Sequence, residues 1–141
     1  MTAPDSSPRV QMVLESALYV RDVRRAVEFY QGVLGLRLID EFDESRGAAM
    51  AAGPSVLLLF LPDVARRGER LPAHGADGAG HVAFRVAPED LPRWREALQA
   101  RGVTIEREHA FGDNPPSIYF RDPDGNLLEL AVRTVWKDLP L

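Results

Sequence analysis

The residues of this sequence with the greatest chemical potential are two glutamates and a histidine at corresponding places in strand-like segments. Glu15 and His81 each open a short segment of alternating polarity, and Glu129 interrupts an apolar run near the C-terminus. Carboxylates and imidazoles can bind cations or transfer protons when they face a common cavity. Charges on strands also commonly face solvent or pair with a nearby arginine, here Arg85 or Arg121.

The two halves of the sequence repeat one pattern, and this pattern must position those residues. In each half a short strand leads into an amphipathic helix that ends in a glycine, and the half closes on an apolar strand. Internal duplication fixes the architecture of a chain, and two copies of a long unit are typical of paired modules in one domain. We therefore predict an α+β domain of two βαβββ modules, 13–62 and 80–132, between the tails 1–12 and 133–141.

The order of the elements follows from periodicity and from turn residues. Asp22 is a suitable N-cap, and apolar residues then recur at helical spacing as far as Gly35. Glu89 or Asp90 should cap the second helix, and the Gly- and Pro-rich stretch 63–80 is typical of a loop. The expected strands are 13–20, 36–42, 48–52 and 55–61 in the first module, and 81–86, 103–108, 117–121 and 127–132 in the second.

The alternation of each strand decides which side chains stay accessible, because each helix must cover the apolar face of its own sheet. In the first module Glu15 and Tyr19 fall on the face opposite the helix. The corresponding face of the second module carries His81, Arg85, Ser117, Tyr119, Arg121, Leu127, Glu129 and Arg133. A polar face that no helix covers is a suitable binding cleft for a small molecule.

The bulk composition excludes several other classes of partner. The chain has 141 residues, a formal net charge of −4 and no cysteine. These values predict one domain without disulfides or thiolate metal sites, and without the basic surface that nucleic acid needs. No apolar run approaches the roughly 18 residues of a membrane span, and the polar N-terminus lacks a signal-like core. We therefore expect a cytoplasmic protein that binds a small-molecule substrate, and neither nucleic acid nor a membrane.

Three stretches of the sequence carry longer motifs. Residues 15–36 fit the pattern E-x-x-L-Y-V-x-D-x-x-R-A-x-x-F-Y-x-x-V-L-G-L, residues 80–84 read GHVAF, and residues 119–129 read YFRDPDGNLLE. In this order they resemble the vicinal oxygen chelate superfamily of glyoxalase I, bleomycin-resistance proteins, fosfomycin-resistance transferases and extradiol dioxygenases. The resemblance implies paired βαβββ modules in a cup-shaped mixed sheet with helices on the outer face, a divalent metal at the base of the cup, and a homodimer.

The resemblance also implies a metal site built from the first and last strands of each module. It transfers three positions to this sequence, Glu15, His81 and Glu129, with Glu15 standing where most members have histidine. The fourth position lies in the last strand of the first module, where Leu57 and Leu58 cannot ligate, so we do not expect a four-ligand glyoxalase I site. Two carboxylates and one imidazole favour Mn, Fe, Mg or Ni, while Zn remains suitable. Glu15 or Glu129 would also act as the catalytic general base.

The remaining accessible polar residues are expected to bind the substrate: Tyr19, Arg85, Ser117, Tyr119, Arg121 and the linker residue His74. An arginine there would bind a carboxylate or phosphonate group, or would neutralise one of the glutamates. Two functions stay open on these residues. One is a metal-dependent enzyme of the glyoxalase or dioxygenase type, and the other is a metal-free protein of the bleomycin-resistance type that sequesters a compound in the same cup.

Overall fold

The first module folds as predicted, with one helix packed against a four-stranded sheet. The computed structural model describes residues 7–42, 44–137 and 139. Helix α1 begins after Asp22, whose carboxylate accepts a hydrogen bond from Arg25 N at 3.0 Å, and it ends at Gly35 in the left-handed conformation. In chain order the module contains β1 (Glu15–Tyr19), α1 (Val23–Leu34), β2 (Arg37–Phe42), β3 (Gly47–Ala52) and β4 (Ser55–Phe60).

The second module repeats this order with a shorter second strand. It contains β5 (His81–Arg85), the 3₁₀ turn η1 (Pro88–Asp90), α3 (Leu91–Ala100), β6 (Arg107–His109), β7 (Ser117–Arg121) and β8 (Leu127–Ala131), and the 3₁₀ turn η2 (Arg133–Val135) follows. The prediction of a strand over 103–108 was wrong in its bounds. Val103 and Ile105 pack against the hydrophobic core instead of pairing with a strand, so pairing begins only at Arg107.

The stretch 63–80 is not simply a loop, because it begins with the short helix α2 (Pro62–Arg67). The signals for this helix are present in the sequence. Pro62 occupies the first helical turn, the last turn is basic, and Gly68 ends the helix in the left-handed conformation. The loop composition of the following residues obscured this single turn and a half of helix.

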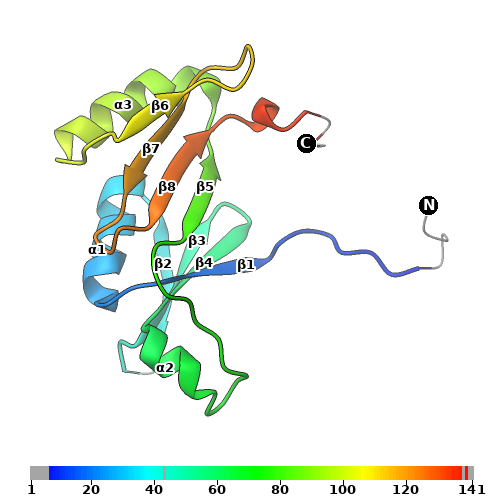
Figure 1. Cartoon of the computed structure of the whole chain (residues 1–141), viewed down its shortest axis with the longest axis vertical. Coiled ribbons are helices and arrows are strands. Elements are labelled where there is room, and N and C mark those ends of the chain that lie inside the picture. Colours follow the sequence, from blue (N-terminus) through cyan, green and yellow to red (C-terminus); the bar gives the residue numbers. More distant parts are fainter. Residues whose placement is uncertain (1–6, 43, 138, 140–141) are drawn as a thin grey trace.

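The strands form two separate four-stranded mixed sheets, one for each module. The first sheet has the order β1-β4-β3-β2 and the second has the order β5-β8-β7-β6. In each sheet the first and last strands of the module pair in parallel, and the other pairs are antiparallel. Figure 1 shows the two sheets one above the other, with α3 beside the upper sheet and α1 beside the lower one. The predicted α+β class with two βαβββ modules is therefore confirmed.

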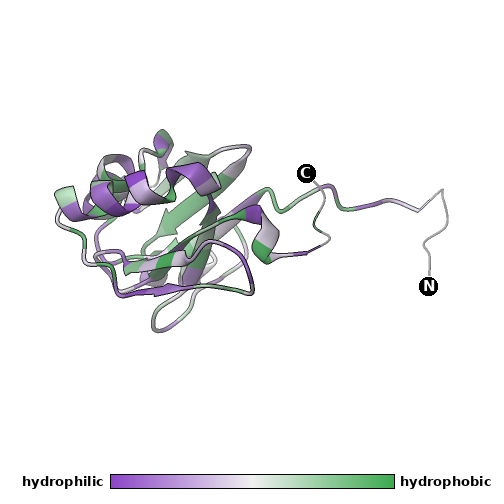
Figure 2. Ribbon diagram, turned by 90° about the horizontal axis from the view of Figure 1, so that it is seen from above, coloured by the Kyte–Doolittle hydropathy of each residue, from purple (hydrophilic) through white to green (hydrophobic). Residues whose placement is uncertain are grey.

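Each helix buries its apolar stripe on one face of its sheet, and we call the opposite face the open face. Figure 2 shows mostly hydrophobic strands beneath helices that carry hydrophilic residues outward. In β1, Leu18 lies on the helix-covered face and is 3% exposed, whereas Glu15 and Tyr19 lie on the open face. The predicted alternation of this strand is therefore correct. None of the helices in the described part of the chain is long and apolar enough to cross a membrane.

A buried polar network joins the two modules. Tyr30 of α1 is fully buried and donates a hydrogen bond at 2.7 Å to Asp122, in the turn between β7 and β8. Asn126 donates to the same carboxylate at 2.9 Å and accepts from Gly80 N at 2.8 Å. Burial, and then the charge of Asp122, raise the pKa of the Tyr30 hydroxyl. The network fixes the start of β5 relative to α1, so both modules share one continuous core.

Candidate functional site

His81 and Glu129 meet on the open face of the second sheet. His81 opens β5, and Glu129 lies on the neighbouring strand β8, directly opposite Ala83. The His81 Nε2 and Glu129 Oε1 atoms are 3.3 Å apart. Glu129 is 7% exposed, so its carboxylate is held in a largely dehydrated place. A buried carboxylate needs partners, and this pair is the strongest chemical feature of the described chain.

The imidazole of His81 is oriented by the backbone. Its Nδ1 atom lies 3.0 Å from the carbonyl oxygen of Leu127. Because a carbonyl oxygen can only accept, this hydrogen bond places a proton on Nδ1 and turns Nε2 toward Glu129. Such an outer hydrogen bond is the usual arrangement of a metal-binding imidazole.

Tyr119 completes the surroundings of Glu129. It lies on β7 directly opposite Glu129, and its ring stacks on His81 with ring centroids 6.5 Å apart. Burial, and then a hydrogen bond to Glu129, raise the pKa of the Tyr119 hydroxyl. The hydroxyl therefore stays protonated at neutral pH and can donate to the carboxylate or to a ligand.

Glu15 does not join this pair within one chain. It is exposed on β1, in the other sheet, and lies opposite Val56 of β4. Among residues 7–42, 44–137 and 139, no group of three or more carboxylates and imidazoles is close enough to hold a metal ion. The structure therefore brings together two of the three predicted ligands, and it leaves Glu15 on the open face of the first sheet.

Two predicted substrate residues, Tyr19 and His74, lie together on the first sheet. The Tyr19 hydroxyl lies 2.6 Å from His74 Nδ1, and the His74 ring packs edge-on against Phe60 at a centroid distance of 4.8 Å. His74 reaches this position because its own backbone N–H bonds to Ala65 of α2. The linker histidine is thus held by specific contacts, which its sequence context did not indicate.

The other predicted substrate residues differ in how available they are. Arg85 is exposed at the end of β5. Arg121 is already engaged, since Nε lies 3.0 Å and Nη2 lies 3.1 Å from the two carboxylate oxygens of Glu106. Ser117 is 1% exposed, and its hydroxyl has no hydrogen-bond partner among the described residues. Glu106 is a partner that sequence alternation missed, because it lies just before β6.

A cavity of about 350 Å³ adjoins Glu129 on the same open face. Its floor is formed by β5 and β8, and one wall is formed by residues 132–136 and 139, which we call the C-terminal segment. The lining residues that matter below are Ala83, Arg85, Phe111, Glu129, Trp136 and Leu139. The sequence had not placed Trp136 or the C-terminal segment, so the cavity could not be predicted.

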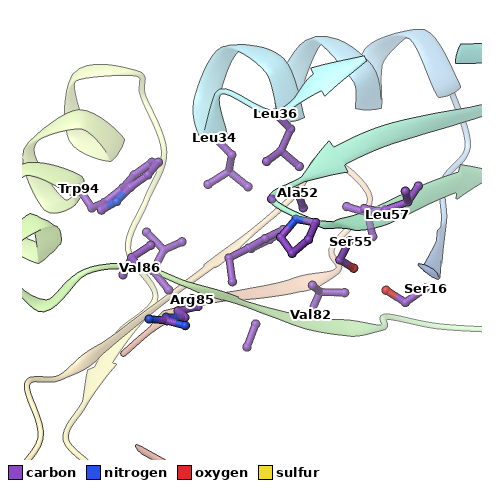
Figure 3. Close-up of a pocket in the computed structure, with 16 residues that line it drawn as sticks. Ser16, Leu34, Leu36, Ala52, Ser55, Leu57, Val82, Arg85, Val86 and Trp94 are labelled. Atoms are coloured by element: carbon purple, nitrogen blue, oxygen red, sulfur yellow. The ribbon is translucent and has the colours of Figure 1, made fainter. Parts of the chain in front are cut away.

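A second cavity, of about 490 Å³, lies between the modules (Figure 3). Figure 3 shows Leu34 and Leu36 on one side and Trp94 on another, with Ser16 and Arg85 beside the strands. The described residues that line it include no carboxylate and no imidazole. This cavity therefore offers neither a carboxylate nor an imidazole to a metal ion.

Comparison with known proteins identifies the family of this chain. The model of the Glyoxalase/Bleomycin resistance protein/Dioxygenase superfamily matches residues 10–130. The glutathione transferase FosA of Serratia marcescens is 34% identical over 123 residues, which cover 87% of this chain and 82% of that protein.

Solved structures show the same fold. A lactoylglutathione lyase from Agrobacterium tumefaciens superposes with a TM-score of 0.85 at 30% identity, covering 92% of this chain and 98% of that one. A mutant of the fosfomycin resistance protein FosX from Listeria monocytogenes, in complex with Mn(II) and 1S,2S-dihydroxypropylphosphonic acid, superposes with a TM-score of 0.68 at 21% identity over 89% of this chain and 95% of that one. The chain belongs to the glyoxalase/bleomycin resistance protein/dioxygenase superfamily.

Proposed function

We propose that this chain is a divalent-metal-dependent enzyme that acts on a small molecule through oxygen atoms of that molecule. The observation that carries the proposal is the 3.3 Å approach of His81 Nε2 to Glu129 Oε1, with Nδ1 committed to a backbone carbonyl. An imidazole nitrogen and a carboxylate oxygen approach this closely when a cation lies between them, and that cation is either a metal ion or the proton of a charged imidazole.

The geometry of this pair fits a metal ion. Ligand atoms about 2.1 Å from one ion are about 3.0–3.4 Å apart at neighbouring positions, and the observed separation lies in this range. One imidazole with carboxylates suits Mn, Fe, Ni, Mg or Zn. The Listeria protein has the same fold and was solved in complex with Mn(II). Manganese is therefore the first ion to test.

Glu15 is the third ligand, and we infer that a second copy of the chain supplies it. The internal repeat makes Glu15 the counterpart of His81, because each is the first residue of its strand and lies opposite the start of the parallel last strand, at Val56 and Leu127 respectively. Both β1 and β5 are edge strands with one unpaired side, and edges are commonly covered by a partner. A symmetric homodimer would bring the open face of the first sheet of one copy against that of the second sheet of the other.

The residues of the chain then have distinct tasks. A bound divalent ion would polarise substrate oxygens as a Lewis acid. His81 is held by the Leu127 carbonyl, and Glu129 is held by Tyr119. The Tyr119 hydroxyl has one proton, which it can donate either to Glu129 or to a substrate oxygen. One of the two carboxylates, Glu15 or Glu129, would also act as the general base that takes a proton from the substrate.

A thiol is the natural second substrate to test. The Serratia relative is called a glutathione transferase, and it matches most of this chain. Leu58 occupies the position in β4 that corresponds to Glu129 in β8, since Leu58 lies opposite Ala17 as Glu129 lies opposite Ala83. The fourth ligand of a glyoxalase I site is thus missing. We therefore propose thiol transfer to a small oxygenated electrophile in preference to isomerisation of a hemithioacetal.

Calorimetric titration of chelator-stripped protein with Mn²⁺ tests the proposal. We expect about one ion per chain in the wild type, and much weaker binding in His81→Ala, in Glu129→Gln and in Glu15→Ala. Glu41→Ala is the matched control, because Glu41 is also an exposed glutamate on an edge strand. Unchanged Mn²⁺ affinity in His81→Ala would contradict the site, and a solution mass near the 15.6 kDa of one chain would contradict the shared ligand.

A further inference from the structure

We propose that the cavity beneath the C-terminal segment binds the ring of a small aromatic carboxylate, whose carboxylate group pairs with Arg85. The inference rests on the proposed function only for the reacting end of such a molecule, which would reach His81 and Glu129. The binding part stands on the cavity itself, and it can be measured without metal.

The C-terminal segment is a fixed wall. Arg133 Nη1 donates to the backbone oxygen of Leu139 at 2.6 Å, and the Thr134 hydroxyl lies 2.5 Å from the side-chain oxygen of Asn114. The backbone N–H of Trp136 bonds to the oxygen of Arg133. Two of these contacts fold the segment on itself, and the bond to Asn114 ties it to the stretch between β6 and β7. The cavity of about 350 Å³ lies between the segment and the sheet, a size within the range of small-molecule pockets.

The cavity walls expose large apolar groups at its mouth. Trp136 is 72% exposed, Leu139 is 50% exposed and Phe111 is 40% exposed. Flat aromatic walls favour an aromatic guest, because ring pairs gain energy beyond the apolar area that they bury. A small molecule is the better occupant than a protein surface, since the floor also holds the carboxylate of Glu129, and buried interface centres are poor in charge.

Arg85 supplies the charge that selects an anion. It has no hydrogen bond or ion pair with any described residue, whereas Arg133 in the same lining is committed to Leu139. Ala83 lies opposite Glu129. Arg85 is the next residue of β5 on the open face, two residues further along the strand, and two residues of a strand span about 6.6 Å. A benzene ring with polar groups at its two ends spans such a step, with one end at Glu129 and the carboxylate at Arg85.

Arg85 also lines the cavity between the modules, as Figure 3 shows. That cavity has Trp94 as its tryptophan, and the cavity beneath the C-terminal segment has Trp136. The chain contains two tryptophans, so each cavity carries its own reporter. This arrangement allows a binding experiment to identify which cavity is filled.

The experiment titrates the chelator-treated full chain with benzoate and follows the two indole N–H resonances by NMR. Acetate keeps the charge without the ring, and benzyl alcohol keeps the ring without the charge. We expect benzoate to shift the Trp136 resonance and not that of Trp94. We also expect acetate and benzyl alcohol each to bind at least roughly 10-fold more weakly than benzoate. Arg85→Gln should weaken benzoate roughly 10-fold and leave benzyl alcohol unchanged. Arg85→Lys should retain part of the benzoate affinity.

Arg107→Gln is the control, because Arg107 is exposed on the same sheet but does not line this cavity. Equal affinity for benzoate and benzyl alcohol, unchanged benzoate binding in Arg85→Gln, or a shift of the Trp94 resonance would each overturn the proposal. A Trp136 resonance that responds to protein concentration and never to benzoate would also overturn it, because a second copy would then fill the cavity. Since the titration is made without metal, these results do not depend on whether the metal site exists.

Discussion

Complementation between two inactive variants would test most directly whether the metal site is shared between copies. Glu15→Ala removes the ligand of the first sheet, and His81→Ala removes a ligand of the second sheet. In a homodimer with shared sites each variant alone loses both of its sites. A mixed dimer pairs the intact His81 and Glu129 of one chain with the intact Glu15 of the other, so it regains one site, while its second site lacks both ligands.

The size of the recovery follows from counting. When equal amounts of the two variants reassort at random in a symmetric dimer, about half of the dimers are mixed, so about one quarter of the wild-type sites are restored. Loss of a group that only orients a metal ligand weakens metal binding roughly 10–100-fold. Each variant alone loses a ligand itself, so its Mn²⁺ affinity should fall by more than this. The assay is the Mn²⁺ bound, at a concentration that fills the wild-type sites but not those of either variant, before and after the variants are unfolded and refolded together. Each variant refolded alone serves as the blank.

Two results would refute this reasoning. If co-refolding restores no binding although mass analysis detects mixed dimers, the ligands do not come from two copies. If Glu15→Ala alone binds Mn²⁺ like the wild type, Glu15 is not a ligand. Mixing Glu41→Ala with His81→Ala gives the reference, because Glu41 lies on β2 and should leave every site that contains an intact His81 functional.

The remaining predictions concern stability and metal retention. Tyr30→Phe should lower the free energy of unfolding by about 1.5–3 kcal/mol in urea, because it removes a buried hydrogen bond to the Asp122 carboxylate; a loss below about 0.5 kcal/mol would contradict this. Burial raises the pKa of Tyr30, so the wild type should lose stability as pH rises above about 10, where the unfolded chain loses that proton, and Tyr30→Phe should lose less. Ser117→Ala should leave the free energy of unfolding unchanged or raise it by about 1 kcal/mol, because the Ser117 hydroxyl is buried without a partner; a clear loss would show that the hydroxyl has a partner in solution. Bound Mn²⁺ should be released as pH falls from about 7 to about 5, because protons compete for the imidazole and the carboxylates, and full retention at the lower pH would count against His81 as a ligand.

The sequence predicted the architecture well because its signals are local. The N-cap at Asp22 and the left-handed Gly35 bound α1 as expected, and β7 occupies the predicted residues. Alternation alone placed Glu129 and Tyr119 on one face of the second sheet. The pairing of β7 with β8 puts these two residues directly opposite each other. Such features depend on residues close in sequence.

The parts of the site that the sequence did not reveal depend on contacts between distant residues. The separation of Glu15 from His81 follows from how the two sheets pack, and periodicity within a strand carries no information on packing. The contact of Tyr19 with His74 spans 55 residues, and the engagement of Arg121 by Glu106 depends on an irregular approach to β6. The C-terminal wall depends on a hydrogen bond between Arg133 and a backbone oxygen, which has no pattern in the sequence.

The internal repeat makes a last prediction about Leu58. It lies on the open face of β4 in the register that Glu129 has in β8, and it is partly exposed. Leu58→Glu would therefore place a carboxylate at the vacant fourth position of the shared site. We expect Mn²⁺ to bind about 10-fold more tightly, because an added ligand fills an open coordination position. Leu57→Glu is the contrasting control, since Leu57 is 2% exposed in the core, and a buried unpaired charge there should unfold the protein. A folded Leu58→Glu dimer with unchanged Mn²⁺ affinity would show that β4 does not face the metal, and the pseudo-symmetric arrangement of the cup would then have to be abandoned.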